Sequence, residues 1–110
     1  MDTQLQKVMD TAYACMQACN HCFNECLKEE DIDMVRECIR LDRECADMCQ
    51  MVLSYAGREG VLQHDLISLC EKICQACGNE CAQHEHMEHC QECAKACFAC
   101  ADACREFVSA

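Results

Sequence analysis

The sequence has no proline, no tryptophan and only three glycines, Gly57, Gly60 and Gly78. Proline and glycine are the residues that most often interrupt helices, so their scarcity allows long continuous helices. Basic residues are also few, with 9 lysines and arginines against 20 acidic residues and a formal net charge of -11. This balance argues against nucleic acid and anionic membranes as partners, and it favours an attraction for cations.

Long apolar runs are missing as well. The segment from Met1 to Lys7 is polar, and no later stretch is apolar enough to act as a secretion signal or to span a bilayer. We therefore expect a cytoplasmic protein with no membrane partner, in which thiols stay reduced. No nucleophile with a base and an orienting group is recognisable, and there is no phosphate-binding loop, so we do not expect an enzyme.

Cysteine is the residue that the sequence has in excess, with 16 among 110 residues. In a secreted chain such a number indicates a disulfide scaffold, whereas in a reducing compartment it indicates metal binding. The length fits one domain, residues 1–110, built around a single core.

Four helices are predicted between short polar joints, at residues 3–28, 32–56, 61–84 and 87–108. Asp31 or Asp33 can cap the second helix, and Gly57 suits a left-handed residue that ends it. Joints this short make consecutive helices antiparallel. The predicted fold is all-α, an antiparallel up-down-up-down four-helix bundle with a cysteine-lined core.

The cysteines recur at helical spacing. Cys15, Cys19, Cys22 and Cys26 lie within roughly 60° of one helix face, and the third helix repeats their 4-3-4 spacing. Those of the other two helices fall within arcs of about 40° and about 80°. All of them occupy positions where a bundle usually has leucine. The predicted metal ligands are Cys15, Cys19, Cys22, Cys26, Cys38, Cys45, Cys49, Cys70, Cys74, Cys77, Cys81, Cys90, Cys93, Cys97, Cys100 and Cys104.

The two ends of the predicted bundle differ. One end, the apolar end, has no cysteine and can be closed by Leu5, Val8, Val52, Leu53, Leu62, Leu66, Ile67, Phe107 and Val108. The other, the histidine end, collects Cys26, Cys38, Cys81, Cys90, Met34, His84 and His86. We predict that metal enters at the histidine end, where His84 and His86 act as ligands. Met34 is expected to face inward, either as a thioether ligand or as plain packing.

Other uses of cysteine explain the pattern less well. Thiols acting only as small apolar groups would leave the core poorly filled. Disulfides between adjacent turns of one helix would constrain little of the unfolded chain. Iron–sulfur clusters need ligands that converge on one point, not a column about 16 Å long. The Cys-x-x-Cys pairs lie inside helices, whereas a reactive thiol is usually exposed at a helix N-terminus, so a thiol-redox protein is kept only as an alternative.

Among thiophilic metals, charge and coordination favour Cu(I). Zn(II) takes four ligands, so the thiolates would saturate at about four ions, or a few more with bridging sulfurs, and leave a large negative charge in the core. Cu(I) is soft and accepts about two or three thiolates, and bridging sulfurs allow roughly one ion per cysteine. We predict storage of multiple Cu(I) ions per chain, with a zinc or mixed-metal thiolate buffer as the alternative.

Three runs of sequence resemble the cytosolic class of bacterial copper storage proteins: ACNHCF at 18–23, IRLDRECAD at 39–47 and CQECAKACF at 90–98. The resemblance covers essentially the whole chain. It implies a cysteine-lined bundle, bound Cu(I) in quantity, metal entering at one end, and a homotetramer. The second helix departs from a full cysteine stripe, with Leu41 and Asp42 where the spacing could take another cysteine, so we expect a thinner column there.

The other histidines carry weaker signals. His89 lies at the edge of the cysteine face, and His64 shows no metal signal. His21 points about 130° away from the cysteines of its helix and suits a surface or oligomer contact.

Two further groups are assigned to the surface. Outward-facing apolar side chains suit a contact between protomers, and these are Tyr13, Met51 and Phe98. A run of charges is interpreted as a surface ion-pair network, formed by Arg40, Asp42, Arg43 and Glu44.

Overall fold

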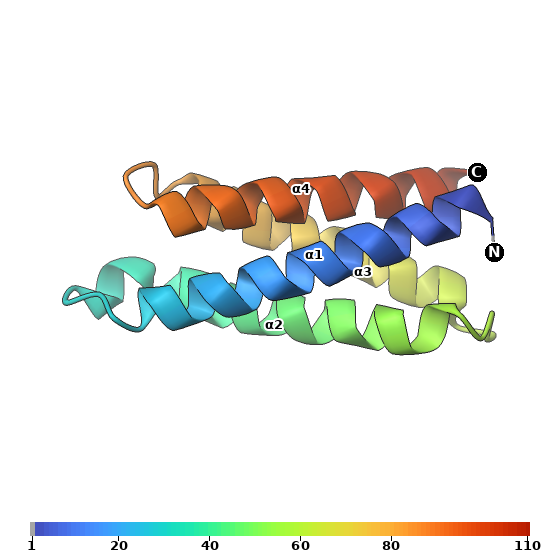
Figure 1. Cartoon of the computed structure of the whole chain (residues 1–110), viewed down its shortest axis with the longest axis horizontal. Coiled ribbons are helices and arrows are strands. Elements are labelled where there is room, and N and C mark those ends of the chain that lie inside the picture. The colour runs from blue at the N-terminus through green and yellow to red at the C-terminus, as the bar shows by residue number, and fades with distance from the viewer. Residues whose placement is uncertain (1) are drawn as a thin grey trace.

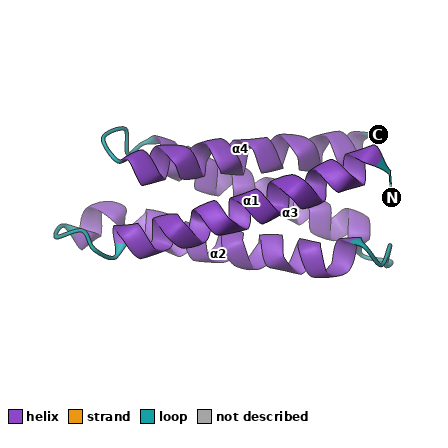
Figure 2. Cartoon of the chain, viewed as in Figure 1, coloured by secondary structure: helices purple, strands orange, loops and turns teal. Residues whose placement is uncertain are grey.

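The computed structural model describes residues 2–110, in which four helices run side by side (Figure 1). Their bounds are α1 Thr3–Cys26, α2 Ile32–Ala56, α3 Gln63–Ala82 and α4 Glu88–Ser109. The molecule extends 44 × 19 × 17 Å. Within the described residues there is no strand, and short loops join the helices (Figure 2). The predicted all-α class is confirmed.

Successive helices are antiparallel, as the short joints predicted. α1 packs against α2 and α4, and α3 packs against the same two helices, so α1 and α3 are diagonal across the core. The start of α1 and the end of α4 lie at the same end of the bundle, which is the apolar end (Figure 1). The opposite, histidine end therefore brings together the end of α1, the start of α2, the end of α3 and the start of α4.

The helix ends differ from the prediction by a few residues. α1 ends at Cys26 because residues 27 and 28 form a turn, and α3 runs only from Gln63 to Ala82. Asp2 caps α1, since its carboxylate accepts a hydrogen bond of 2.8 Å from the Leu5 N–H. Asp31 is the N-cap residue of α2, but its side chain makes no capping hydrogen bond with any described residue.

The predicted role of Gly57 is wrong. Its φ of -68° is right-handed, and the left-handed residue of this joint is Glu59, with φ 51°. The N–H groups of Arg58 and Glu59 still bond to the carbonyls of Tyr55 and Ala56, at 3.1 and 3.3 Å. Helical turns thus continue past Gly57, and the chain reverses only after them.

The core runs along the whole bundle axis. All sixteen cysteines have no exposed area, and Leu5, Val8, Val52 and Ile67 continue the core at the apolar end with at most 2% exposure. Leu62 is 50% exposed because it lies in the turn before α3. The prediction that Leu62 helps to close the apolar end is therefore wrong. The remaining predicted residues pack half-buried against the core: Leu53, Leu66, Phe107 and Val108.

Two of the three outward apolar residues lie as predicted. Tyr13 and Met51 are both more than half exposed. Phe98 is half-buried, because its ring lies over Gly78 of α3. A Cβ atom at Gly78 would be only 2.6 Å from that ring. The close approach of α3 to α4 at this point therefore depends on glycine.

Candidate metal centre

The sixteen cysteine Sγ atoms form a column through the middle of the bundle, which we call the sulfur column. All are free, buried thiols. Thiols on adjacent turns of one helix are in contact, as Cys15 and Cys19 are at 4.0 Å and Cys93 and Cys97 at 3.9 Å. The helical spacing therefore places every cysteine predicted as a ligand in one continuous core.

Thiols from different helices are equally close. The Sγ atom of Cys15 lies 3.6 Å from Cys45, 3.9 Å from Cys74 and 3.7 Å from Cys97, so it touches one sulfur of each other helix. A disulfide bond measures about 2.05 Å. These contacts therefore join reduced thiols across the diagonal of the bundle as well as between neighbouring helices.

Potential ligand groups overlap along the sulfur column. In each group the donor atoms all lie within 4.8 Å of one another. Cys15, Cys19 and Cys97 each belong to two groups, so a thiolate in one group is also a ligand in the next. The three groups that share them are Cys15, Cys19, Cys45 and Cys97; Cys15, Cys49, Cys74 and Cys100; and Cys19, Cys77, Cys93 and Cys97.

The sulfur spacing matches metal–thiolate coordination. A metal–sulfur bond of about 2.3 Å sets the sulfurs of one trigonal or tetrahedral site roughly 3.8–4.0 Å apart. The contacts among Cys22, Cys26, Cys38 and Cys90 measure 3.8–4.0 Å. Ions could therefore bind without a large displacement of the helices.

Burial favours the protonated, neutral form of a thiol in this core. Burial raises the pKa of Cys26 to about 12, and the nearby Cys38 adds to the rise. At neutral pH such a group keeps its proton, which makes a metal-free core tolerable. Each thiol that becomes a metal ligand must then release its proton.

Asp42 lies in the sulfur column with no exposed area, so its interpretation as part of a surface ion-pair network is wrong. Its Oδ1 accepts hydrogen bonds from Cys77, Cys93 and Cys81 at 3.4, 3.5 and 3.6 Å, and its Oδ2 accepts one from Cys38 at 3.8 Å. Asp42 follows Cys38 by one helical turn and therefore shares its inward face. Burial, and then the nearby cysteines, raises the pKa of Asp42 to about 11.

His89 reaches the sulfur column at the histidine end. Its Nδ1 atom lies 3.6 Å from the sulfurs of Cys22 and Cys90 and 4.0 Å from that of Cys26, and the four residues form a potential ligand group. Periodicity placed His89 only at the edge of the cysteine face. What brings it to the sulfurs is the packing of α4 against α1, which no spacing within α4 reveals.

The two predicted histidines lie less close to sulfur. The Nε2 atom of His84 is 2.9 Å from the Glu80 carboxylate, and His84 is only 8% exposed. His86 is exposed. Among the described residues, neither imidazole forms a hydrogen bond with a sulfur. The Gln91 side chain donates to the carbonyl of His84 at 3.0 Å and so fixes the turn between α3 and α4.

Met34 is 39% exposed, so its predicted inward orientation is wrong. Counted back from Cys49 in alternating steps of four and three residues, the inward positions of α2 are Cys45, Asp42, Cys38 and Val35. Val35, not Met34, is the fully buried residue at this end of the helix. At the same end the thioether of Met87 is 3.9 Å from the Cys90 sulfur, and Met87 is 6% exposed.

These features define a class: a four-helix bundle whose core is a column of reduced thiols, suited to soft metal ions. The chain belongs to the copper storage protein family, whose family model matches residues 1–109. The resemblance noted in the sequence is thereby confirmed.

Individual relatives cover nearly the whole chain. The cysteine-rich protein YhjQ of Bacillus subtilis (strain 168) is 43% identical over 109 residues, which are 99% of this chain and 100% of that protein. The Cu(I)-bound copper storage protein BsCsp3 is 42% identical, with a TM-score of 0.90 over 96% of this chain and 99% of that one. A cytosolic copper storage protein from Streptomyces lividans, loaded with five coppers, is 34% identical, with a TM-score of 0.93 over 97% and 93%.

Proposed function

We propose that the protein stores Cu(I), bound by cysteine thiolates along the sulfur column. The observation that carries this proposal is the sharing of Cys15, Cys19 and Cys97 between neighbouring ligand groups. Bridging thiolates let singly charged ions follow one another, and about one Cu(I) per cysteine would neutralise the thiolate charge. The Cu(I)-bound and copper-loaded relatives support the same metal.

The proposed ligands are the sixteen cysteines, together with His84 and His86 at the histidine end, where metal would enter. Their contacts with neighbouring sulfurs add His89 and Asp42 as candidates. The family is named for storage, which supports a role without catalysis. The single continuous core supports one domain over residues 1–110.

Anaerobic titration of the reduced, metal-free protein tests this function. With a competing Cu(I) chelator present, we expect more than about eight Cu(I) per chain, because each thiolate can bridge two ions. In a matched titration, Zn(II) binding should saturate at about four ions per chain. Saturation with copper near four ions, or displacement of copper by a modest excess of zinc, would favour the zinc or mixed-metal buffer instead.

We further propose a cytoplasmic location and a homotetramer. Sixteen free thiols suit a reducing compartment, and the Streptomyces lividans relative is described as cytosolic. Within residues 2–110 no helix is both long and apolar enough to cross a membrane. An exposed apolar groove of about 660 Å³ between α2 and α3 supports a contact between copies, and its apolar lining is Met48, Met51, Leu66, Leu69 and Ile73.

Sedimentation measures the assembly directly. The wild type should sediment at four times the 12.5 kDa mass of the chain. Met51→Glu with Leu69→Glu places charge in the groove and should shift the mass towards the monomer. Leu27→Glu with Val61→Glu, at exposed residues that do not line the groove, serves as the matched control. A wild-type mass of 12.5 kDa would contradict the tetramer.

A further inference from the structure

Two thiols of the sulfur column, Cys38 on α2 and Cys81 on α3, lie unusually close together. Their Sγ atoms are 3.3 Å apart. The other hydrogen-bond contacts between cysteine sulfurs of the described residues measure 3.6–4.0 Å. A disulfide bond is about 2.05 Å long, so among these contacts this pair needs the smallest movement of sulfur to form one.

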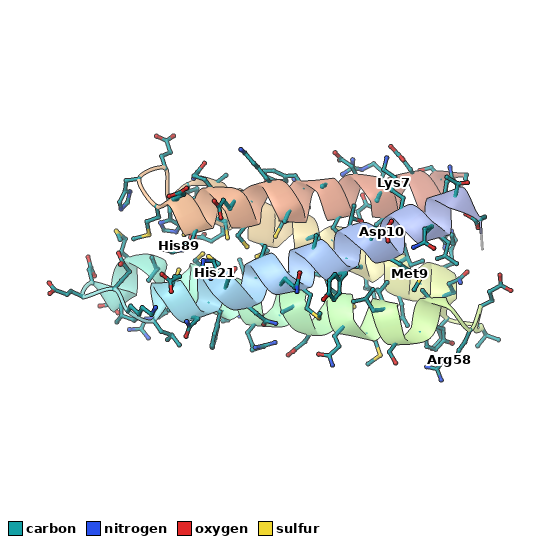
Figure 3. All side chains as sticks on the ribbon, viewed as in Figure 1. Lys7, Met9, Asp10, His21, Arg58 and His89 are labelled. Atoms are coloured by element: carbon teal, nitrogen blue, oxygen red, sulfur yellow. The ribbon has the colours of Figure 1, made fainter. Side chains whose placement is uncertain are left out.

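The pair lies in the part of the sulfur column near the histidine end. Cys38 also contacts the sulfurs of Cys22 and Cys90, at 3.8 and 4.0 Å. The Nδ1 atom of His89 lies 3.6 Å from the same two sulfurs. Sulfur atoms, drawn in yellow, are visible between the helices near His89 (Figure 3). A metal ion bound in this part of the column therefore touches the pair, although neither thiol has any exposed area.

The two thiols belong to a potential ligand group that contains oxygen as well as sulfur. Its donors are three sulfurs and one carboxylate oxygen, all within 4.8 Å of one another, from Cys22, Cys38, Asp42 and Cys81. Cu(I) prefers soft sulfur ligands, whereas Cu(II) also accepts oxygen ligands. This group is therefore suited to copper in either oxidation state, and it holds the ion against two adjacent thiols.

The sulfur column can lose this pair of thiols and remain continuous. The three ligand groups that share thiolates contain neither Cys38 nor Cys81. If these two sulfurs are joined, Asp42 keeps its contacts with Cys77 and Cys93, at 3.4 and 3.5 Å. The pair can therefore supply electrons without interrupting the bridging ligands and without leaving a buried carboxyl group unsatisfied.

We propose that the protein also reduces Cu(II) to Cu(I), with Cys38 and Cys81 as the electron donors. The inference rests on the proposed storage of Cu(I) and adds a way for oxidised copper to join the store. The Cys38 thiolate binds Cu(II) and gives it one electron, which yields Cu(I) and a sulfur radical. The radical bonds to the Cys81 thiolate, which the short contact holds in place. The resulting disulfide radical anion gives its extra electron to a second Cu(II).

The reaction balances without any further oxidant or reductant. Two Cu(II) become two Cu(I), two S–H bonds break, one S–S bond forms, and two protons go to solvent. Two of the sixteen cysteines are consumed, so fourteen remain as thiols that can bind the Cu(I) produced. The reaction uses up its own thiols and is therefore stoichiometric, not catalytic.

Anaerobic addition of two equivalents of Cu(II) sulfate to the reduced, metal-free, full-length protein tests this activity. The electron paramagnetic resonance signal of Cu(II) should disappear, and one free thiol should be lost for each Cu(II) added. After the remaining thiols are alkylated in acid, tandem mass spectrometry of the digested protein should find Cys38–Cys81 as the main disulfide. A persistent Cu(II) signal, or disulfides spread evenly over many cysteine pairs, would overturn the proposal.

Two double variants separate the role of this pair from a general loss of thiols. Cys38→Ser with Cys81→Ser removes the proposed electron donors. The matched control, Cys45→Ser with Cys74→Ser, removes another pair from α2 and α3, whose sulfurs are 3.7 Å apart. The first variant should reduce Cu(II) on the order of tenfold more slowly than the wild type, because its remaining thiols are less well placed to pair. The control should keep the wild-type rate, and equal rates in the two variants would overturn the proposal.

Direct loading with Cu(I) distinguishes this activity from storage. Both double variants should bind about two Cu(I) ions fewer than the wild type, because each lacks two thiolates. A wild type that takes up many Cu(I) ions but leaves Cu(II) unreduced would refute the reduction alone. A wild type that fails to take up many Cu(I) ions would instead refute the storage function itself.

Discussion

Asp42 replaces a cysteine in an otherwise regular pattern. The residues Cys38, Asp42, Cys45 and Cys49 have the same 4-3-4 spacing as the four cysteines of α1. The carboxyl group therefore stands among thiols that donate to it at 3.4–3.8 Å. A carboxylic acid that keeps its proton satisfies these contacts without a buried charge.

The pKa of Asp42 predicts a pH effect on the metal-free protein. An unfolded aspartate has a pKa near 3.9, whereas burial raises the pKa of folded Asp42 to about 11. The stability linked to this proton is present below about pH 4 and is lost as pH rises towards about 11. Asp42→Asn has no proton to lose, so its advantage over the wild type should grow to on the order of 2 kcal/mol or more at pH 8.

Urea denaturation of the reduced, metal-free proteins at pH 5 and pH 8 measures this difference. Asp47→Asn is the matched control, because Asp47 is exposed and paired with Arg43 at 2.9 Å. The control should show no gain that depends on pH. The same difference between Asp42→Asn and the wild type at both pH values would contradict the protonated state.

At the scale of the helices, the approach of α3 to α4 depends on one glycine. A Cβ atom at Gly78 would come within 2.6 Å of the Phe98 ring. Gly78→Ala gains about 1 kcal/mol of helix propensity but overpacks this contact at a cost of about 1–3 kcal/mol. We expect a net loss of about 1 kcal/mol in the free energy of unfolding.

Two further variants define this effect in thermal or urea denaturation. A Cβ atom at Gly57 would meet no other group within 4 Å, and φ at this residue is -68°. Gly57→Ala should therefore stabilise the protein by about 0.4–1 kcal/mol. Gly78→Ala with Phe98→Leu should recover most of the loss, because the smaller side chain makes room. A stabilising Gly78→Ala would mean that the ring moves aside freely.

Much of the fold could be predicted from the sequence because cysteine itself carries the helical period. The four helices, their order and the inward face of every cysteine follow from that spacing. Helix ends were less accurate, since Glu59 rather than Gly57 takes the left-handed conformation. Turn geometry there depends on local hydrogen bonds that composition does not reveal.

The candidate site was predictable wherever one helix determines it. Asp42 has the inward spacing, but its charge favoured a surface interpretation, and only the polar thiols around it make burial acceptable. His89 depends on the contact between α1 and α4. Its position is therefore a property of two helices packed together, beyond the reach of periodicity in either one.

For the whole molecule, the core divides into a sulfur-rich part and an apolar end. Neutral thiols are small apolar groups, so the metal-free core can stay packed. We expect circular dichroism of the reduced, metal-free protein to show mainly helix, and Cu(I) to raise its melting temperature, because a ligand bound only by the folded state stabilises it. A chain that gains helix only with metal would contradict a preformed column.

This division of the core predicts that stability and storage respond to different residues. Ile67 is 1% exposed at the apolar end, so Ile67→Ala should lower the free energy of unfolding of the metal-free protein by about 2–4 kcal/mol. It removes no sulfur, and the number of bound Cu(I) ions should stay the same. Cys74 contacts the sulfurs of Cys15 and Cys45 at 3.9 and 3.7 Å.

Cys74→Ala removes one bridging ligand from the middle of the sulfur column. It should therefore lower the number of bound Cu(I) ions by about one, while costing the metal-free protein only about 1 kcal/mol, because alanine is nearly as large as cysteine. Urea denaturation of the metal-free proteins, with metal analysis of the loaded ones, measures both effects in the same preparations. If Ile67→Ala also lost copper, the apolar end would have to shape the sulfur column as well as support the fold, and the two parts of the core would not be independent.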